Sequence, residues 1–237
     1  MRPCLAIPIF EHGATIGDVV EALAPLGLAC FVVDDGSSGP TQARLGELAQ
    51  RHAWLRIERH ERNRGRGAAL QTAYRLAHRA GFSHVVQLDA DGQHDARDVP
   101  HFLEAARRDP RALVLGEPIF DASAPAIRLY GRELSKAIVR LQTLSAAVRD
   151  PLCGFRCIPL RPTVELLDAV RFGSRMDFDP ELVVRLVRAG LPVVNVPTAV
   201  AYPAGGLSHF RMVEDNVRIA WAYARLAAGL VRRSARA

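Results

Sequence analysis

Short apolar runs alternate with longer amphipathic segments in the N-terminal part of the chain, and this alternation restricts the fold more than any other feature. Four runs have strand character, at residues 5–10, 29–33, 54–59 and 85–88. Three segments between them have helical spacing of apolar residues, at 13–26, 40–51 and 63–80. Strands and helices in this order build a mostly parallel central sheet with right-handed crossovers and helices on its faces. We therefore predict an α/β fold.

Each predicted strand is followed at once by a polar cluster. The four clusters lie at residues 8–12, 34–37, 63–67 and 89–94. Ligands of parallel α/β sheets bind beyond the carboxyl ends of the strands. We therefore expect the four clusters to line one crevice.

The fourth cluster carries a candidate metal site. Its strand is followed by Asp89, Asp91 and Gln93, and side chains two residues apart point the same way from an extended backbone. Two carboxylates this close repel each other unless a cation lies between them, and oxygen ligands suit Mg2+ or Mn2+. Gly92 lets the chain turn without blocking a ligand. The alternative is an ordinary polar turn, but not an EF-hand, which needs Asp or Asn and then Gly where Gln93 and His94 stand.

The second and third clusters offer groups that suit a nucleotide. Asp34 or Asp35 can accept hydrogen bonds from a base N–H or a ribose hydroxyl, and capping the following turn or helix is the alternative role of Asp34. In the third cluster, two glycines permit close backbone approach, while Arg64 and Arg66 supply charge for a diphosphate. Leu70 at the third small position excludes a dinucleotide fingerprint, and a P-loop is excluded because no Gly-Lys-Ser/Thr is present.

Composition narrows the partners and the compartment. The formal net charge of +6 favours anionic partners such as phosphate esters and acidic lipid. Nucleic acid is not expected, because the arginines do not alternate with stacking aromatics. The four cysteines are too scattered for a disulfide scaffold, which predicts buried thiols in a reducing compartment. We expect a cytoplasmic protein that is able to lie on the membrane surface, because neither a signal-peptide core nor a membrane-spanning run is present.

Five motifs in order resemble family 2 glycosyltransferases, which have the GT-A fold. They are Pro8-Ile9-Phe10, Val33-Asp34-Asp35-Gly36-Ser37, Asn63-Arg64-Gly65-Arg66-Gly67-Ala68-Ala69, Asp89-Ala90-Asp91-Gly92-Gln93 and Asp150-Pro151-Leu152-Cys153-Gly154-Phe155-Arg156. The last motif is similar to a segment of the dolichol-phosphate mannosyltransferase branch. The resemblance implies a single GT-A domain over residues 1–210, followed by a C-terminal basic amphipathic helix over 211–237.

The resemblance also implies a nucleotide-diphosphosugar donor and inversion by direct displacement. A divalent metal held by Asp89, Asp91 and Gln93 would neutralise charge that develops on the leaving nucleoside diphosphate. The residues implied in donor binding are Pro8, Glu11, Asp34, Asp35, Asn63, Arg66, Asp89, Arg156 and His209. The chain departs from the family at two of these positions, with Glu11 in place of the usual Asn and His209 in place of Lys.

The candidate catalytic residues are Asp91 and Asp179. Residues 178–185 resemble the family's Glu-Asp-x-x-Leu-x-x-Arg segment, in which the Asp is the base, and Asp179 falls on that position. A hydroxyl acceptor needs such a base, whereas a lipid phosphate arrives ionised. The alternative is that Asp179 caps a helix whose first position is Pro180.

The C-terminal part points to a lipid-linked acceptor. Residues 205–212 and 215–219 are similar to family 2 enzymes of aryl-polyene lipid biosynthesis, which implies a lipid-linked hydroxyl or carboxyl acceptor. Residues 212–236 have the spacing of one basic amphipathic helix, with Val217 and Trp221 near one face. Such a helix either adsorbs to anionic lipid or packs on the domain with its charged face in solvent.

We therefore expect a metal-dependent glycosyltransferase that acts on a polyprenyl phosphate or a glycolipid-type acceptor. The sequence leaves two other classes of protein open. A nucleotidyltransferase has a related sheet, although its Gly-rich triphosphate loop is missing between Leu5 and Val19. A non-catalytic sugar-nucleotide-binding protein has no need for both Asp89 and Asp91.

Overall fold

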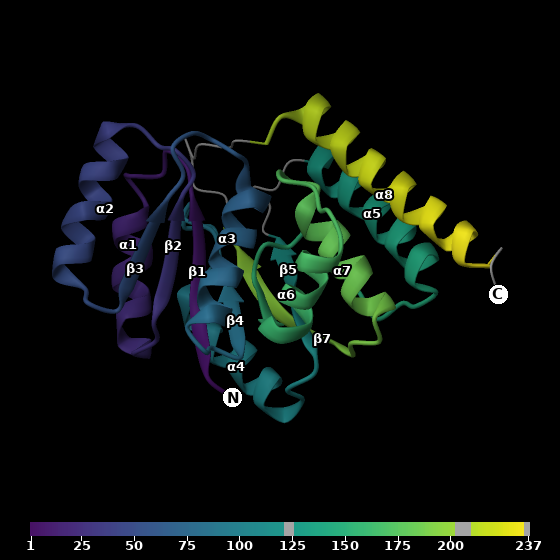
Figure 1. Ribbon diagram of the computed structural model, residues 1–237, viewed down its shortest axis with the longest axis horizontal. Helices are drawn as coiled ribbons and strands as arrows, with labels where there is room; N and C mark the ends of the chain where they lie inside the picture. The colour runs from purple at the N-terminus through teal and green to yellow at the C-terminus, as the bar shows by residue number, and fades with distance from the viewer. Residues whose placement is uncertain (121–125, 202–209, 235–237) are drawn as a thin grey trace.

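The computed structural model describes residues 1–120, 126–201 and 210–234 (Figure 1). In this part of the chain, seven strands form one sheet in the order β3-β2-β1-β4-β6-β5-β7. The strands are β1 (Pro3–Ile9), β2 (Cys30–Asp34), β3 (Leu55–Arg59), β4 (His84–Gln87), β5 (Leu113–Phe120), β6 (Arg156–Pro159) and β7 (Val193–Val200). Strand β6 is antiparallel to β4 and β5, and the other pairs are parallel. The predicted α/β fold with a mostly parallel sheet is confirmed.

Helices cover both faces of the sheet. Packed against one face are α1 (Ile16–Leu23), α2 (Gly39–Arg51) and α4 (Val99–Arg108). The other face carries α3 (Arg66–Arg79), α5 (Ala126–Thr143), α6 (Leu160–Ala169), α7 (Phe178–Arg188) and α8 (Met212–Ser234). Alternate residues of β1 feed the two layers, since Cys4 and Ala6 lie in one core cluster while Leu5 and Ile7 lie in the other. This alternation accounts for a strand that is apolar at every position.

The fourth predicted strand is shorter than expected. Strand β4 ends at Gln87, and a turn over residues 89–92 follows, in which Gly92 has a φ of 73°. The expectation that Asp89, Asp91 and Gln93 project together from an extended backbone is therefore wrong. Within this turn, the Asp91 Oδ1 atom accepts a hydrogen bond from the Gln93 N–H at 3.0 Å.

The C-terminal helix packs on the domain, which is one of the two alternatives that the sequence left open, and adsorption to lipid stays a prediction. Helix α8 lies along α5 (Figure 1) and buries Ile219, Tyr223 and Leu226 in the core cluster of that face. The apolar face predicted from the sequence points to solvent instead, because the side chains of Val217 and Trp221 are 62% and 63% exposed. The helix therefore packs on the domain through one apolar face and leaves a second apolar face in solvent.

Two further expectations concern cysteines and membrane spans. All four cysteines are buried and free, as predicted. Within the described ranges, no helix has both the length and the apolar character that a bilayer crossing requires.

Candidate active site

One cavity of about 920 Å³ receives residues from all four polar clusters. Its polar end is formed by Pro8, Asp35, Asn63, Arg66, Asp89, Asp91, Gln93, Arg175 and Asp179. The predicted convergence of the clusters is confirmed. The cavity also extends along α5 and α8, where its walls include the apolar Leu134, Ile138, Phe210, Ile219 and Ala220. The polar Arg132, Ser135, Asp215, Asn216 and Tyr223 line it there as well.

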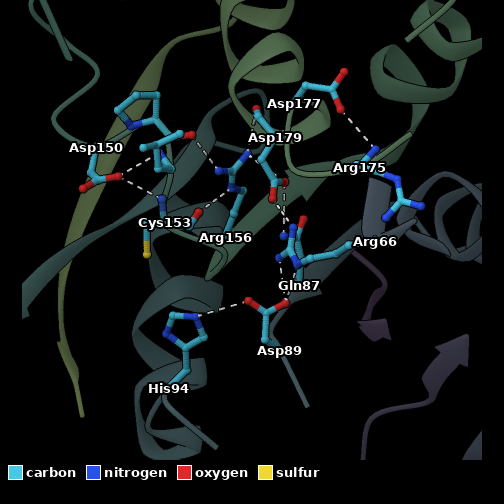
Figure 2. A network of polar contacts seen from close by, with 12 residues as sticks. Arg66, Gln87, Asp89, His94, Asp150, Cys153, Arg156, Arg175, Asp177 and Asp179 are labelled. Atoms are coloured by element: carbon cyan, nitrogen blue, oxygen red, sulfur yellow. Dashed lines mark hydrogen bonds and ion pairs between the residues drawn. The ribbon is translucent and has the colours of Figure 1, made fainter. Parts of the chain in front are cut away.

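Arg66 joins the two best candidate carboxylates at the polar end. Its Nε donates to the Asp89 Oδ1 atom at 2.8 Å, and its Nη1 donates to Asp179 (Figure 2). The Asp179 side chain is 7% exposed, and that of Arg66 is 15% exposed. Burial opposes ionisation of Arg66, but Asp179 and Asp89 outweigh it and raise the pKa of the guanidinium. Both carboxylates are therefore compensated by one buried cation.

Asp89 and Asp91 have opposite electrostatic environments. Burial opposes ionisation of Asp89, but Arg66 and then His94 lower the pKa of this carboxyl below its usual range. The His94 Nε2 atom lies 3.8 Å from the Asp89 Oδ2 atom. Burial and the negative charge of Asp89 raise the pKa of Asp91. No arginine offsets this effect at Asp91, and the Gln93 N–H, His94 and His12 counter it only in part.

A second buried guanidinium, that of Arg156, also contacts Asp179. Arg156 is fully buried, and it donates to the main-chain carbonyls of Cys153, Asp179 and Pro151 at 2.8, 3.1 and 3.0 Å. Its Nη1 also lies 3.3 Å from the Asp179 Oδ1 atom. The structure therefore places Arg156 behind the cavity wall, in contact with the lining residue Asp179 but not itself among the lining residues, although the sequence assigned it to the donor.

Asp179 does not cap its helix. Helix α7 begins at Phe178 with Asp177 at the N-cap position, so Asp179 lies within the first turn and Pro180 is not the first helical residue. The Asp179 carboxylate interacts with Arg66 and Arg156, and the Gln87 amide donates to its Oδ1 atom at 3.4 Å. The capping alternative is wrong, and the side chain faces the cavity.

Asp35 and Asn63 line the cavity on the side of the second and third clusters. Both oxygens of the Asp35 carboxylate accept hydrogen bonds, from the Arg64 N–H at 2.9 Å, the Gly65 N–H at 2.7 Å and His60 at 2.7 Å. Asp35 thus ties the loop after β3 to the end of β2. The buried carboxylate that the sequence assigned to the donor therefore also fixes this loop.

Two predicted donor contacts, Glu11 and Asp34, are not among the cavity-lining residues. Asp34 accepts the Ser37 N–H at 2.9 Å, which is the turn-capping role given as its alternative. Glu11, with a φ of 56°, accepts from the Ser38 N–H at 2.7 Å and the Ser38 hydroxyl at 2.8 Å. Both carboxylates therefore hold the loops around the cavity, while His209 lies outside the described residues.

The glycines of the third cluster make room for the protein's own chain. A Cβ atom on Gly65 would collide with the carbonyl oxygen of Ser174 and the Cγ atom of Arg175. A Cβ on Gly67 would meet Phe178 and the same loop. Gly65 also lines the cavity, and close approach of a ligand to its backbone stays a prediction. Arg64, also expected at the diphosphate, is exposed and borders a second, smaller hollow instead.

The sequence patterns did not predict three sets of residues that line the cavity. Arg132 enters from α5 and pairs with Asp150 at 2.7 Å, and Arg175 enters from the loop before α7. Leu134 and Ile138 form part of the apolar wall. None of these residues belongs to a motif. The one sequence signal was the helical spacing of apolar residues in α5, which indicates that one face of this helix is buried.

The family model for Glycosyl transferase family 2 matches residues 4–154. The polyprenol monophosphomannose synthase of Mycolicibacterium smegmatis is 29% identical over 195 residues, which cover 79% of this chain and 71% of that protein. The resemblance to aryl-polyene enzymes stays a prediction.

Solved structures share the fold. Glucosyl-3-phosphoglycerate synthase from Mycobacterium tuberculosis, in complex with Mn2+ and uridine-diphosphate-glucose, aligns with a TM-score of 0.66 at 21% identity, covering 98% of this chain and 78% of that one. Mannosyltransferase PcManGT from Pyrobaculum calidifontis, in complex with GDP-Man and Mn2+, aligns with a TM-score of 0.62 at 18% identity, covering 99% and 75%. The fold is therefore GT-A.

The enzyme class follows from the family match, which spans well over half of the chain. A nucleotidyltransferase and a non-catalytic binding protein, the two classes left open by the sequence, are thereby set aside. The chain belongs to glycosyl transferase family 2 and is a glycosyltransferase.

Proposed function

We propose that this enzyme transfers a sugar from a nucleotide-diphosphosugar to a lipid-linked acceptor, with a polyprenyl phosphate as the acceptor class. The observation that carries the proposal is the shape of one cavity, which joins a carboxylate-rich end at Asp89 and Asp179 to an apolar arm between α5 and α8. A nucleotide-sugar is polar and would occupy only the polar end of the cavity. The apolar arm suits the hydrocarbon chain of a lipid acceptor.

The donor side rests on Asp35, Asn63 and the turn at Asp89–Gln93, which border the same end of the cavity. Two proteins of the same fold bind a nucleotide-sugar together with Mn2+, one with a uridine and one with a guanosine nucleotide. We infer that the present enzyme holds its donor at the corresponding end of the sheet.

The residues at the turn fit a divalent metal. Asp91 is a partly buried carboxylate whose pKa is raised by burial and by Asp89, which is the environment that a bound cation relieves. Arg66 already shows that a cation is stable against Asp89. We assign Asp89, Asp91 and Gln93 as the residues that would hold Mg2+ or Mn2+. When bound, the metal supplies Lewis-acid stabilisation of the departing diphosphate.

Asp179 separates two classes of acceptor. Its carboxylate already interacts with Arg66, Arg156 and Gln87. To accept a proton from a hydroxyl, it would have to exchange the contact with Arg66 for one with the acceptor. An ionised phosphate nucleophile needs no such exchange. This arrangement favours a phosphate acceptor, in which Asp179 keeps Arg66 beside Asp89, and a hydroxyl acceptor with Asp179 as the base is the second candidate.

The apolar arm supports the lipid part of the proposal. Leu134 and Ile138 on α5, and Ile219, Ala220 and Tyr223 on α8, line this part of the cavity. Leu134 is 64% exposed, and Val213, Val217 and Trp221 lie exposed on α8. Exposed apolar side chains beside an apolar channel suit entry of a hydrocarbon from a membrane surface. We propose peripheral attachment to the cytoplasmic face of the membrane.

The test is transfer of radiolabelled sugar in the presence of Mn2+. UDP- and GDP-linked sugars are each supplied with undecaprenyl phosphate and, separately, with dodecanol as a lipid hydroxyl. The expected product is a lipid-phosphate sugar formed from one nucleotide class. Product with neither acceptor, while the donor is bound, would contradict the lipid acceptor.

A further inference from the structure

The cavity contains one arginine whose guanidinium makes no hydrogen bond or ion pair with the described residues of the protein. Three arginines line it, namely Arg66, Arg132 and Arg175. Arg66 is paired with Asp89 and Asp179, and Arg132 is paired with Asp150. Among the residues that the structure describes, the Arg175 guanidinium has no hydrogen bond or ion pair. In Figure 2 the dashed line at Arg175 ends on its backbone nitrogen, which donates to Asp177 at 3.1 Å.

The loop that carries Arg175 is held firmly in place. The carbonyl oxygen of Ser174 accepts the Ala68 N–H at 2.9 Å, and that of Gly173 accepts the Gln71 side chain at 3.0 Å. The Gly173 N–H donates to the buried Glu181 carboxylate at 3.1 Å. A side chain on a loop with these contacts loses less conformational entropy on binding than one on a free loop. The unpaired charge is thus presented from a fixed backbone.

Arg175 is also directed to the part of the cavity where an anion is expected. Its Cγ atom passes over Gly65, which stands at the N-cap of α3 beside Arg66. The N-terminal end of a helix carries partial positive charge, which favours phosphate. Its charge also lies near the start of α8, since the pKa of Glu214 is lowered mainly by Arg211 and, to a smaller extent, by Arg218 and then Arg175. Arg175 therefore lies between the donor end and the acceptor arm.

We propose that Arg175 binds the phosphate oxygens of a substrate of the transfer reaction. The inference deepens the proposed function and rests on it, because both proposed substrates carry phosphate: the diphosphate of the donor and the phosphate of the lipid. A guanidinium meets two phosphate oxygens at once, which an ammonium group does not. Arg175 is then a specificity residue for phosphorylated ligands.

The test compares Arg175→Gln with Arg171→Gln, an exposed arginine four residues away that lines the smaller hollow. Titration calorimetry with Mn2+ measures UDP, GDP and the matching nucleosides, and thermal melting checks that both variants fold. If the donor diphosphate is the ligand, Arg175→Gln weakens diphosphate binding roughly tenfold and leaves nucleoside binding unchanged. Arg171→Gln leaves both unchanged.

If the lipid phosphate is the ligand, nucleotide binding stays the same in Arg175→Gln. The KM for geranylgeranyl phosphate then rises roughly tenfold, and the KM for the donor does not. An Arg175→Gln variant that matches Arg171→Gln in nucleotide binding and in both KM values would overturn the inference. So would an equal loss of nucleoside and nucleotide affinity, which indicates a distorted pocket.

Failure of the proposed function is recognised separately, because the wild type would then bind neither nucleotide. In that case inorganic pyrophosphate with Mn2+ is titrated instead. Weaker binding to Arg175→Gln than to the wild type supports a phosphate-binding role, and pyrophosphate affinity that does not depend on Arg175 overturns it.

Discussion

Asp89 and Asp179, which lie on distant segments of the chain, are bridged by the single guanidinium of Arg66. One carboxylate follows β4 and the other lies in the first turn of α7. The bridge places a candidate metal ligand and a candidate catalytic residue within the reach of one side chain. It also means that the charge balance of the site depends on Arg66.

Replacement of Arg66 by Gln should destabilise the metal-free protein. The change leaves Asp89 and Asp179 without their shared cation, and breaking a buried ion pair costs about 3 kcal/mol. The free energy of unfolding in urea, measured in EDTA, should fall by this amount. Mn2+ should restore stability more in the variant than in the wild type, because the metal takes over part of the compensation. The control Arg161→Gln removes an exposed pair with Glu165 and should cost less than about 1 kcal/mol; equal losses would contradict the role of Arg66.

Replacement of Asp91 by Asn should abolish Mn2+-dependent transfer while the fold is kept. We expect kcat/KM to fall at least about a hundredfold, because the metal loses a charged ligand while Asp89 stays paired. Asp95→Asn is the matched control, since Asp95 lies on the same segment and pairs with the exposed Arg97. Full turnover in Asp91→Asn would remove the proposed metal site.

The same variant should change how stability depends on pH. The pKa of Asp91 is raised in the folded protein by burial and by Asp89. The folded state therefore favours the protonated carboxyl, and this contribution is present below the unfolded pKa, about 3.9, and is lost as the pH rises through the folded value. In EDTA, the stability of Asp91→Asn relative to the wild type should increase from pH 4 to pH 7. A difference that does not change over this range would show that Asp91 ionises as it does in the unfolded chain.

Replacement of Asp179 by Asn should separate the two acceptor classes. With undecaprenyl phosphate, we expect partial activity, because an ionised nucleophile needs no base and the amide still accepts a hydrogen bond from Arg66. With a hydroxyl acceptor, loss of the base should cost roughly a hundredfold or more in kcat. Equal, complete loss with both acceptors, in a variant that still binds nucleotide, would assign Asp179 a role in aligning the donor.

The exposed face of α8 should govern attachment to lipid without affecting stability. Val217→Ser with Trp221→Ser removes apolar side chains that are already in solvent, so the free energy of unfolding should change by less than about 0.5 kcal/mol for each. Sedimentation with anionic liposomes should fall severalfold. Leu226→Ala, at a buried position of the same helix, should instead cost about 2–4 kcal/mol and leave liposome binding unchanged at temperatures where it is folded. Unaltered sedimentation of the double variant would contradict membrane docking by this face.

The sequence by itself determined the alternating architecture and the edge at which the site forms. Period-two and period-3.6 patterns are properties of the local backbone, so β1 to β4 and the helices between them were found within a few residues of their predicted positions. Asp89 and Asp91 were recognised as candidate site residues for the same reason, because they closely follow a predicted strand. The antiparallel strand β6 was not predicted, since its pairing with β4 and β5 depends on long-range contacts.

The tertiary structure decided which polar groups face the cavity and which hold it together. Arg156 and Arg66 belong to equally plausible motifs, but Arg156 is enclosed by three main-chain carbonyls while Arg66 reaches two carboxylates. Gly65 lines the cavity, and its missing side chain also makes room for the loop with Ser174 and Arg175, which the sequence did not indicate. Side-chain pairing depends on segments that are distant in sequence and adjacent only after folding. Local spacing therefore located the site, and long-range packing assigned its charges.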